Sequence, residues 1–135
     1  METKKTVVAT DVAEQEFTRW AEALDLDLAP EGMNEDDRRS FTEQKRLVVN
    51  AIGAGRLTIS AEGQAVFKPR DGLEAIVFRE PKGDVVINGR APSDAARVAV
   101  YAQKMTGEPL ARFEGMLVRD YKVCTAIVTL LLSAR

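Results

Sequence analysis

The sequence predicts an α+β fold with two N-terminal helices, a central antiparallel meander of three to four strands, and three C-terminal helices. Apolar residues recur at the three- and four-residue spacing of a helix in residues 12–53 and 92–134, and they alternate with polar residues in 56–88. Because helices and strands form separate runs, a parallel sheet of alternating strands and helices is disfavoured. The 135 residues have the length of a single domain.

The first helix is predicted over residues 12–24, after a loose or strand-like segment at residues 1–10. Asp11 and Glu14 have the spacing of a capping box, with aspartate in place of serine or threonine. A stripe of apolar residues at helical spacing then faces the expected core. Its members are Phe17, Trp20, Ala21 and Leu24.

The second helix follows a linker that contains Pro30 and Gly32. We expect Asn34 to cap this helix and Gly53-Ala54-Gly55 to end it with a left-handed glycine. Its apolar face is expected to comprise Phe41, Leu47, Val48, Ala51 and Ile52.

The strands are predicted where the hydrophobic period changes to two. Leu57–Ser60 and Ala65–Lys68 alternate apolar and polar residues on either side of a short turn, which predicts a β-hairpin. Residues Leu73–Arg79 predict a third strand because they are rich in residues that favour strands. Val85–Ile87 is a candidate for a fourth, short strand.

Three helices are predicted after residue 91. Ser93 is the expected cap of the first, Gly107 ends it, Pro109 opens a short second helix, and Asp120 begins the closing helix. The buried stripe of the first is expected to consist of Ala95, Val98, Ala99, Ala102 and Met105.

The closing helix is the most apolar part of the chain. Residues Val123–Leu132 are almost wholly apolar, and one thin polar stripe runs beside them. The stripe consists of Lys122, Thr125, Thr129 and Ser133. Such a helix must be covered on about three sides, so either the domain wraps around it or a partner covers it. The run is about half of the roughly 20 residues that a bilayer crossing needs, so we expect no membrane partner.

The residue types of an enzyme or a metal site are largely missing. The chain has no histidine and one cysteine, so we expect no catalytic residues, no metal and no cofactor. Cys124 lies among apolar residues and is expected to be an inert core thiol. A single cysteine also fits a reducing compartment, which favours the cytoplasm.

Charge is unevenly distributed along the chain. Residues 1–37 contain eleven acidic and three basic residues, a net charge of −8, whereas residues 38–135 contain ten acidic and sixteen basic residues, a net charge of +6. The second predicted helix and its exit carry a basic side. This side comprises Arg38, Arg39, Lys45, Arg46 and Arg56. Acids are scattered among these residues, so a solvated face is favoured over a nucleic-acid site.

Three segments are similar to parts of a known family. The first is the hairpin of residues 55–67, the second is a strand leading into Glu80-Pro81-Lys82-Gly83, and the third is residues 116–132, in which Asp120 opens an apolar helix. In these features the C-terminal two thirds of the chain resembles the tail assembly chaperones of long-tailed bacteriophages and prophages. The chain departs from that pattern at Lys82, where a small hydroxyl residue is expected, and at residues 84–91, where an earlier helix is expected.

The resemblance implies a non-enzymatic assembly factor that acts in the host cytoplasm. Its partners would be the tape measure protein and the tail tube protein. From the apolar terminal helices themselves, we also expect the chain to form a homo-oligomer through them. The residues expected to bind protein partners are Met105, Leu110, Phe113, Met116, Leu117, Tyr121, Leu130, Leu131 and Leu132. Two other functions stay open: a structural virion component, such as a head–tail joining or tail tube protein, and a small nucleic-acid-associated regulator.

Overall fold

The structure is a computed structural model that describes residues 9–24, 35–70, 72–80 and 94–132. These ranges hold five helices and three strands, which confirms the predicted α+β class and the order of its parts. In chain order they are α1 (Thr10–Ala23), α2 (Glu35–Gly53), β1 (Leu57–Ile59), β2 (Ala65–Phe67), β3 (Ile76–Phe78), α4 (Asp94–Thr106), α5 (Leu110–Glu114) and α6 (Val118–Leu132).

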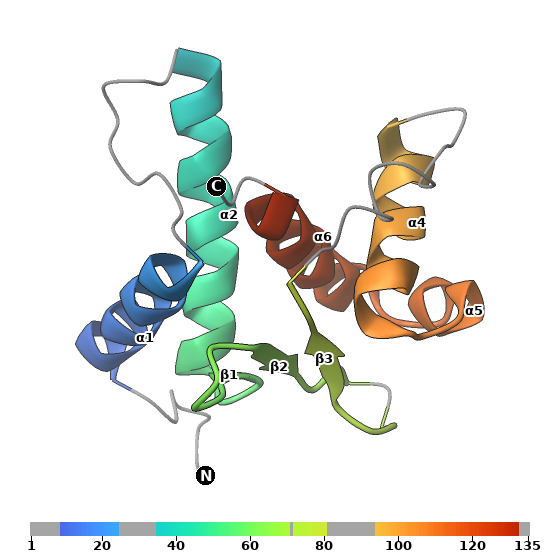
Figure 1. Cartoon of the computed structure of the whole chain (residues 1–135), viewed down its shortest axis with the longest axis horizontal. Coiled ribbons are helices and arrows are strands. Elements are labelled where there is room, and N and C mark those ends of the chain that lie inside the picture. Colours follow the sequence, from blue (N-terminus) through green and yellow to red (C-terminus); the bar gives the residue numbers. More distant parts are fainter. Residues whose placement is uncertain (1–8, 25–34, 71, 81–93, 133–135) are drawn as a thin grey trace, which may run out of the picture.

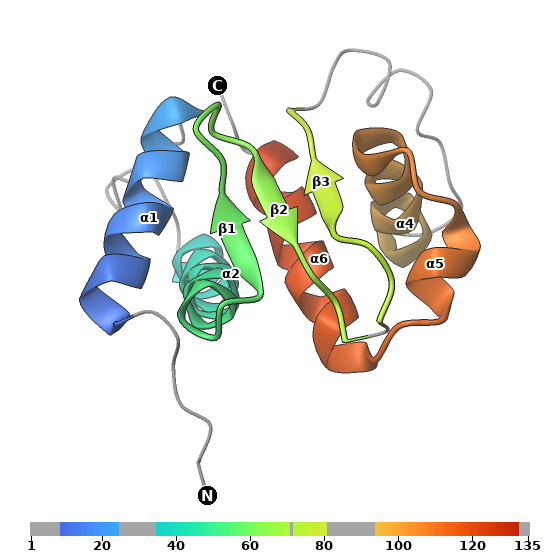
Figure 2. The ribbon, with the colours of Figure 1, turned by 90° about the horizontal axis from the view of Figure 1, so that it is seen from below.

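The helices form one layer and the small sheet lies across it (Figure 1). Helix α6 lies between α2 and α4 and packs against both, while α1 packs on the outer side of α2. The sheet crosses the face of α2 and α6, and α5 completes the corner beside α4 (Figure 2). This arrangement places the closing helix in the centre of the molecule.

The three strands form an antiparallel meander in the order β1-β2-β3. Their alternating residues point into the core, as period-two patterning requires. The register aligns these inward residues in two cross-strand rows. One row is Leu57, Phe67 and Ile76, and the other is Ile59, Ala65 and Phe78. All six side chains are buried.

Helix α6 is a core helix, because α2, α4 and the sheet surround it. Its buried residues are Asp120, Val123, Cys124, Ala126, Ile127, Val128, Leu130 and Leu131. Of the two alternatives for this helix, the structure therefore supports the one in which the domain wraps around it. On its polar stripe, the hydroxyls of Thr125 and Thr129 donate to the carbonyls of Tyr121 and Thr125, at 3.0 and 2.8 Å, which lets both threonines be half-buried.

The apolar stripe predicted for the first helix is confirmed, and two helix ends agree with the sequence. Phe17, Trp20, Ala21 and Leu24 are all buried. On α2, Val48, Ala51 and Ile52 are buried, while Phe41 and Leu47 are partly buried against the core. Gly55 and Gly107 follow α2 and α4 with φ angles of 78° and 77°, in the left-handed region that glycine adopts without strain.

Some predicted boundaries are wrong. The residue before α1 is Ala9, which makes no side-chain cap, and Asp11 lies inside the first turn with its carboxylate accepting the Val12 N–H, so there is no capping box. The third strand is limited to Ile76–Phe78, and α6 begins two residues before Asp120. The expected caps Asn34 and Ser93, the fourth strand at Val85–Ile87, Ala95 as a core residue and the stripe residue Ser133 lie outside what is described.

A buried ion pair connects the segment after β2 to the start of α6. Asp120 is completely buried, and its carboxylate accepts the backbone N–H of Arg70 at 2.7 Å and a bond from the Arg70 guanidinium. The Arg70 side chain keeps 28% of its surface exposed, so its charge still reaches water. The aspartate that opens the apolar helix in the sequence is therefore a structural anchor.

Candidate protein-binding groove

The corner between α4 and α6 is built from the short helix α5 and the turns on either side of it. Arg112 holds α5 in place, because its guanidinium donates to the Glu108 carboxylate at 3.1 Å and to the Glu74 carbonyl at 2.6 Å. Phe113 is buried and packs edge-on against the Tyr121 ring of α6, with 6.4 Å between ring centroids. The aromatic contact thus joins α5 to α6, while the polar contacts join α5 to the turn before it and to the segment before β3.

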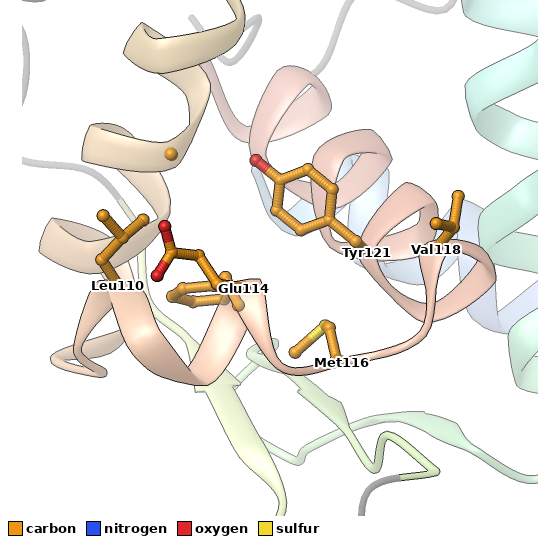
Figure 3. Close-up of a pocket in the computed structure, with 7 residues that line it drawn as sticks. Leu110, Glu114, Met116, Val118 and Tyr121 are labelled. Atoms are coloured by element: carbon orange, nitrogen blue, oxygen red, sulfur yellow. The ribbon is translucent and has the colours of Figure 1, made fainter.

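A groove of about 360 Å³ opens at this corner (Figure 3). We call it the α5–α6 groove; its lining residues are Ala99, Leu110, Phe113, Glu114, Met116, Val118 and Tyr121. Leu110 and Glu114 reach it from α5, while Tyr121 projects into it from α6. All of the lining side chains except Glu114 are apolar or aromatic. The volume lies in the range of small-ligand and peptide sites.

The rim of the groove exposes large apolar side chains to solvent. Val118 is 71% exposed and Leu110 is 40% exposed. Leu117, directly before α6, is 49% exposed and extends this surface. Large exposed apolar residues that gather beside a groove are typical of protein-interaction sites, whereas isolated ones are common on any surface. The arrangement can hold an apolar side chain of another protein.

The residues expected to bind partners divide into three groups. Leu110 and Leu117 are exposed, and Tyr121 and Leu132 are half-buried. Phe113 and Met116 are buried but line the floor of the groove. Met105, Leu130 and Leu131 are at most 2% exposed and belong to the core. For those three, the expected role at an interface is not supported, because neighbouring helices and the sheet already cover them.

Three lining residues were not anticipated from the sequence: Ala99, Glu114 and Val118. A signal for Val118 exists, because the polar stripe of the closing helix, extended back by one helical turn from Lys122, passes through position 118. The pattern therefore places an apolar residue on the solvent side of the helix, which marks a docking position only where other exposed apolar residues gather beside it. No comparable pattern identifies Ala99 or Glu114.

On the basic side of α2, three of the five cations are paired with the chain's own acids. Arg39 pairs with Glu35 at 3.6 Å, Lys45 pairs with Glu14 at 3.3 Å, and Arg46 pairs with Glu43. Lys45 also lies over the Phe17 ring, 5.6 Å from its centroid. A surface whose cations are already paired is poorly suited to collect phosphates.

The described residues contain few other chemical features. Cys124 is buried, as expected, with its sulfur 3.8 Å from that of Met116. In these parts of the chain, no three histidine, cysteine or acidic residues are grouped so that they could hold a metal ion, and no helix is both long and apolar enough to cross a membrane. Comparison of the whole chain with protein-family models, curated proteins and solved structures finds no match.

Proposed function

We propose that this chain is a non-enzymatic tail assembly chaperone, which binds the tape measure protein in the host cytoplasm while the phage tail assembles. The α5–α6 groove would be its client-binding site. The observation that carries the proposal is the exposed apolar rim formed by Leu110, Leu117 and Val118 on an otherwise well-covered core. The resemblance of the sequence to tail assembly chaperones supplies the identity of the client.

The groove suits a client that must be kept from aggregating. Its floor is rigid, because Phe113 is packed against Tyr121 and α5 is held by Arg112. Met116, on the same floor, is a flexible side chain that adapts to differently shaped apolar groups. An amphipathic helix laid into a groove by a few apolar anchors is a common mode of recognition between proteins.

The test is co-expression of the chain with the tape measure protein of the phage or prophage that encodes it. We expect the wild-type chain to co-purify with the tape measure protein and to raise its soluble fraction. The double substitution Leu110→Ser with Val118→Ser removes two apolar contacts from the groove while leaving the core untouched. Each contact is worth on the order of 1.5 kcal/mol when buried, so capture should fall at least about tenfold.

A matched control places the same change elsewhere. Val12 on α1 and Leu73 before β3 are 44% and 53% exposed and do not line the groove. Val12→Ser with Leu73→Ser should leave capture unchanged. Equal capture by the groove variant and the wild type would refute the proposed site, as would an equal loss in the control.

Two other experiments can be considered as tests of the proposal. Deleting residues 119–135 is no clean test, because the structure makes α6 the central core helix and its loss would unfold the domain. Particle composition is a better one: a chaperone of this kind leaves before the virion is complete. Recovery of the chain in stoichiometric amount from purified particles would instead favour a structural virion component.

A further inference from the structure

A second, smaller pocket lies on the other side of the N-terminal half of α6. Its volume is about 170 Å³, and it forms where the C-terminal half of α2 meets the end of β2 and the first turns of α6. Three arginines line it, Arg56, Arg70 and Arg119, together with Asn50. We call it the arginine pocket. Its walls are apolar and include Leu47 and Val123.

The arginine pocket carries uncompensated positive charge. Arg70 is paired with the buried Asp120, whereas the guanidinium of Arg56 has a single polar partner among the described residues, the Lys68 carbonyl at 3.5 Å. Arg119 is exposed and has no ion pair or hydrogen bond from its side chain within the described ranges. Among the residues that the structure describes, no acidic one lines the pocket. Elsewhere the exposed arginines of α1 and α2 mostly pair with a neighbouring glutamate, whereas two of the three arginines at this pocket, Arg56 and Arg119, have no ion pair within the described ranges.

The size and walls of the pocket restrict what it can hold. Guanidinium groups bind carboxylates and phosphates through paired hydrogen bonds. The pocket is smaller than the roughly 300 Å³ at which sites for nucleotide-sized ligands begin. Apolar walls beneath a charged rim suit an anionic group that is carried on a short hydrocarbon stem. A glutamate or aspartate side chain has this form, and free phosphate does not.

The arginine pocket and the α5–α6 groove lie on different sides of the first turn of α6 and meet at consecutive residues. Val118, on the rim of the groove, is the direct neighbour of Arg119, on the rim of the pocket. We infer that the arginine pocket binds an acidic side chain of the protein that docks in the α5–α6 groove, so that the preferred client segment combines apolar and acidic residues. The inference rests on the proposed function for the identity of that partner.

The test uses hexapeptides of alternating residues and the intact chain. One peptide alternates glutamate with leucine and the other alternates glutamine with leucine, both with blocked ends, and inorganic phosphate is a third probe. Binding is followed by NMR through the backbone amides of Arg56, Arg119 and Val123. We expect saturable shifts with the glutamate peptide, and affinities at least about tenfold lower with the glutamine peptide and with phosphate at the same ionic strength.

Paired variants assign the binding to the pocket. Arg56→Gln with Arg119→Gln should weaken glutamate-peptide binding at least about tenfold, while Arg70 is kept because its partner is buried. The control, Arg38→Gln with Arg39→Gln, makes the same change in net charge on exposed arginines of α2 outside the pocket and should leave the affinity unchanged.

Three results would overturn the inference. They are equal affinity for the glutamate and glutamine peptides, equal affinity for phosphate, and an unchanged affinity in the variant that lacks Arg56 and Arg119. These results can be distinguished from results that refute the proposed function. If the Leu110 and Val118 substitutions abolish capture of the tape measure protein but the Arg56 and Arg119 substitutions leave peptide affinity unchanged, only the proposal of an acidic subsite is refuted. If the peptides bind as expected but no tape measure protein is captured, the proposal that the tape measure protein is the client is refuted.

Discussion

Replacement of Asp120 by alanine is expected to destabilise the fold more than any exposed charge change. The Asp120 carboxylate is completely buried and accepts bonds from both the backbone N–H and the guanidinium of Arg70. Each hydrogen bond to a charged group is worth about 1.5–3 kcal/mol in net stability. Because Arg70 is 28% exposed and can turn toward water once freed, the lower end applies, and Asp120→Ala should cost about 3 kcal/mol.

Replacement of the partner, Arg70, by alanine should lower the free energy of unfolding by at least as much. Arg70→Ala leaves the carboxylate of Asp120 enclosed with only a backbone N–H for compensation, and an unpaired buried charge costs about 3–5 kcal/mol. The double variant should cost less than the sum of the two single changes, by about 1–3 kcal/mol, because each single change already breaks the same interaction.

Urea denaturation followed by fluorescence measures these differences. Trp20 is the only tryptophan and is buried, so its emission reports global unfolding. With an m-value of about 2 kcal/mol/M, a loss of 3 kcal/mol lowers the midpoint by about 1.5 M urea. Arg39→Ala serves as the control, since its pair with Glu35 is 3.6 Å long with both side chains mostly exposed. That change should not move the midpoint measurably.

Two results would refute the reasoning. One is a cost below about 1 kcal/mol for Asp120→Ala, which would mean that the pair contributes no more than a surface ion pair. The other is strict additivity of Asp120→Ala and Arg70→Ala, which would mean that the two side chains do not interact.

Three more predictions follow from burial, charge and exposure. Leu130→Ala should lower the free energy of unfolding by about 2–5 kcal/mol in the same urea assay, because Leu130 is 1% exposed and its loss leaves a cavity; a cost near zero would contradict the core position of α6. The hydrogen bond from Arg46 holds the pKa of Glu43 below its ordinary 4.5, so the pair favours the fold above that pH and loses its effect as the pH falls through the lowered pKa; an NMR titration of Arg46→Gln should return the pKa of Glu43 toward 4.5. If the chain self-associates through the α5–α6 groove, light scattering should show an oligomer for the wild type and the 14.8 kDa monomer for Leu110→Ser with Val118→Ser, and a monomeric wild type would contradict this.

Local structure was largely predictable from the sequence. The apolar stripe of α1, the alternating strands of the hairpin, and the glycines that end α2 and α4 each follow from rules that act over a few residues. The wrong boundaries have local causes as well. Asp11 has the spacing of a capping residue, but α1 begins before it, and the third strand is shortened to the residues that pair with β2.

The groove was only partly predictable. Leu110, Phe113, Met116, Leu117 and Tyr121 were expected to serve an interface, and all of them lie in or beside the groove. The sequence could not separate them from Met105, Leu130 and Leu131, which are equally apolar and occupy the core. The gathering of Arg56 and Arg70, which flank the β1–β2 hairpin, with Arg119 in the first turn of α6 has no signal in the sequence, because Arg119 is about 50 residues away along the chain.

The sequence by itself determined that the chain has an α+β fold and that the closing helix must be covered on most sides. Only the tertiary structure decided that the covering comes from α2, α4 and the sheet, and that the rim around Leu110 and Val118 stays exposed to solvent. The physical reason is that the hydrophobic effect is non-directional: the pattern of apolar residues shows how much surface must leave water and on which side of a helix, but not which segment will cover it.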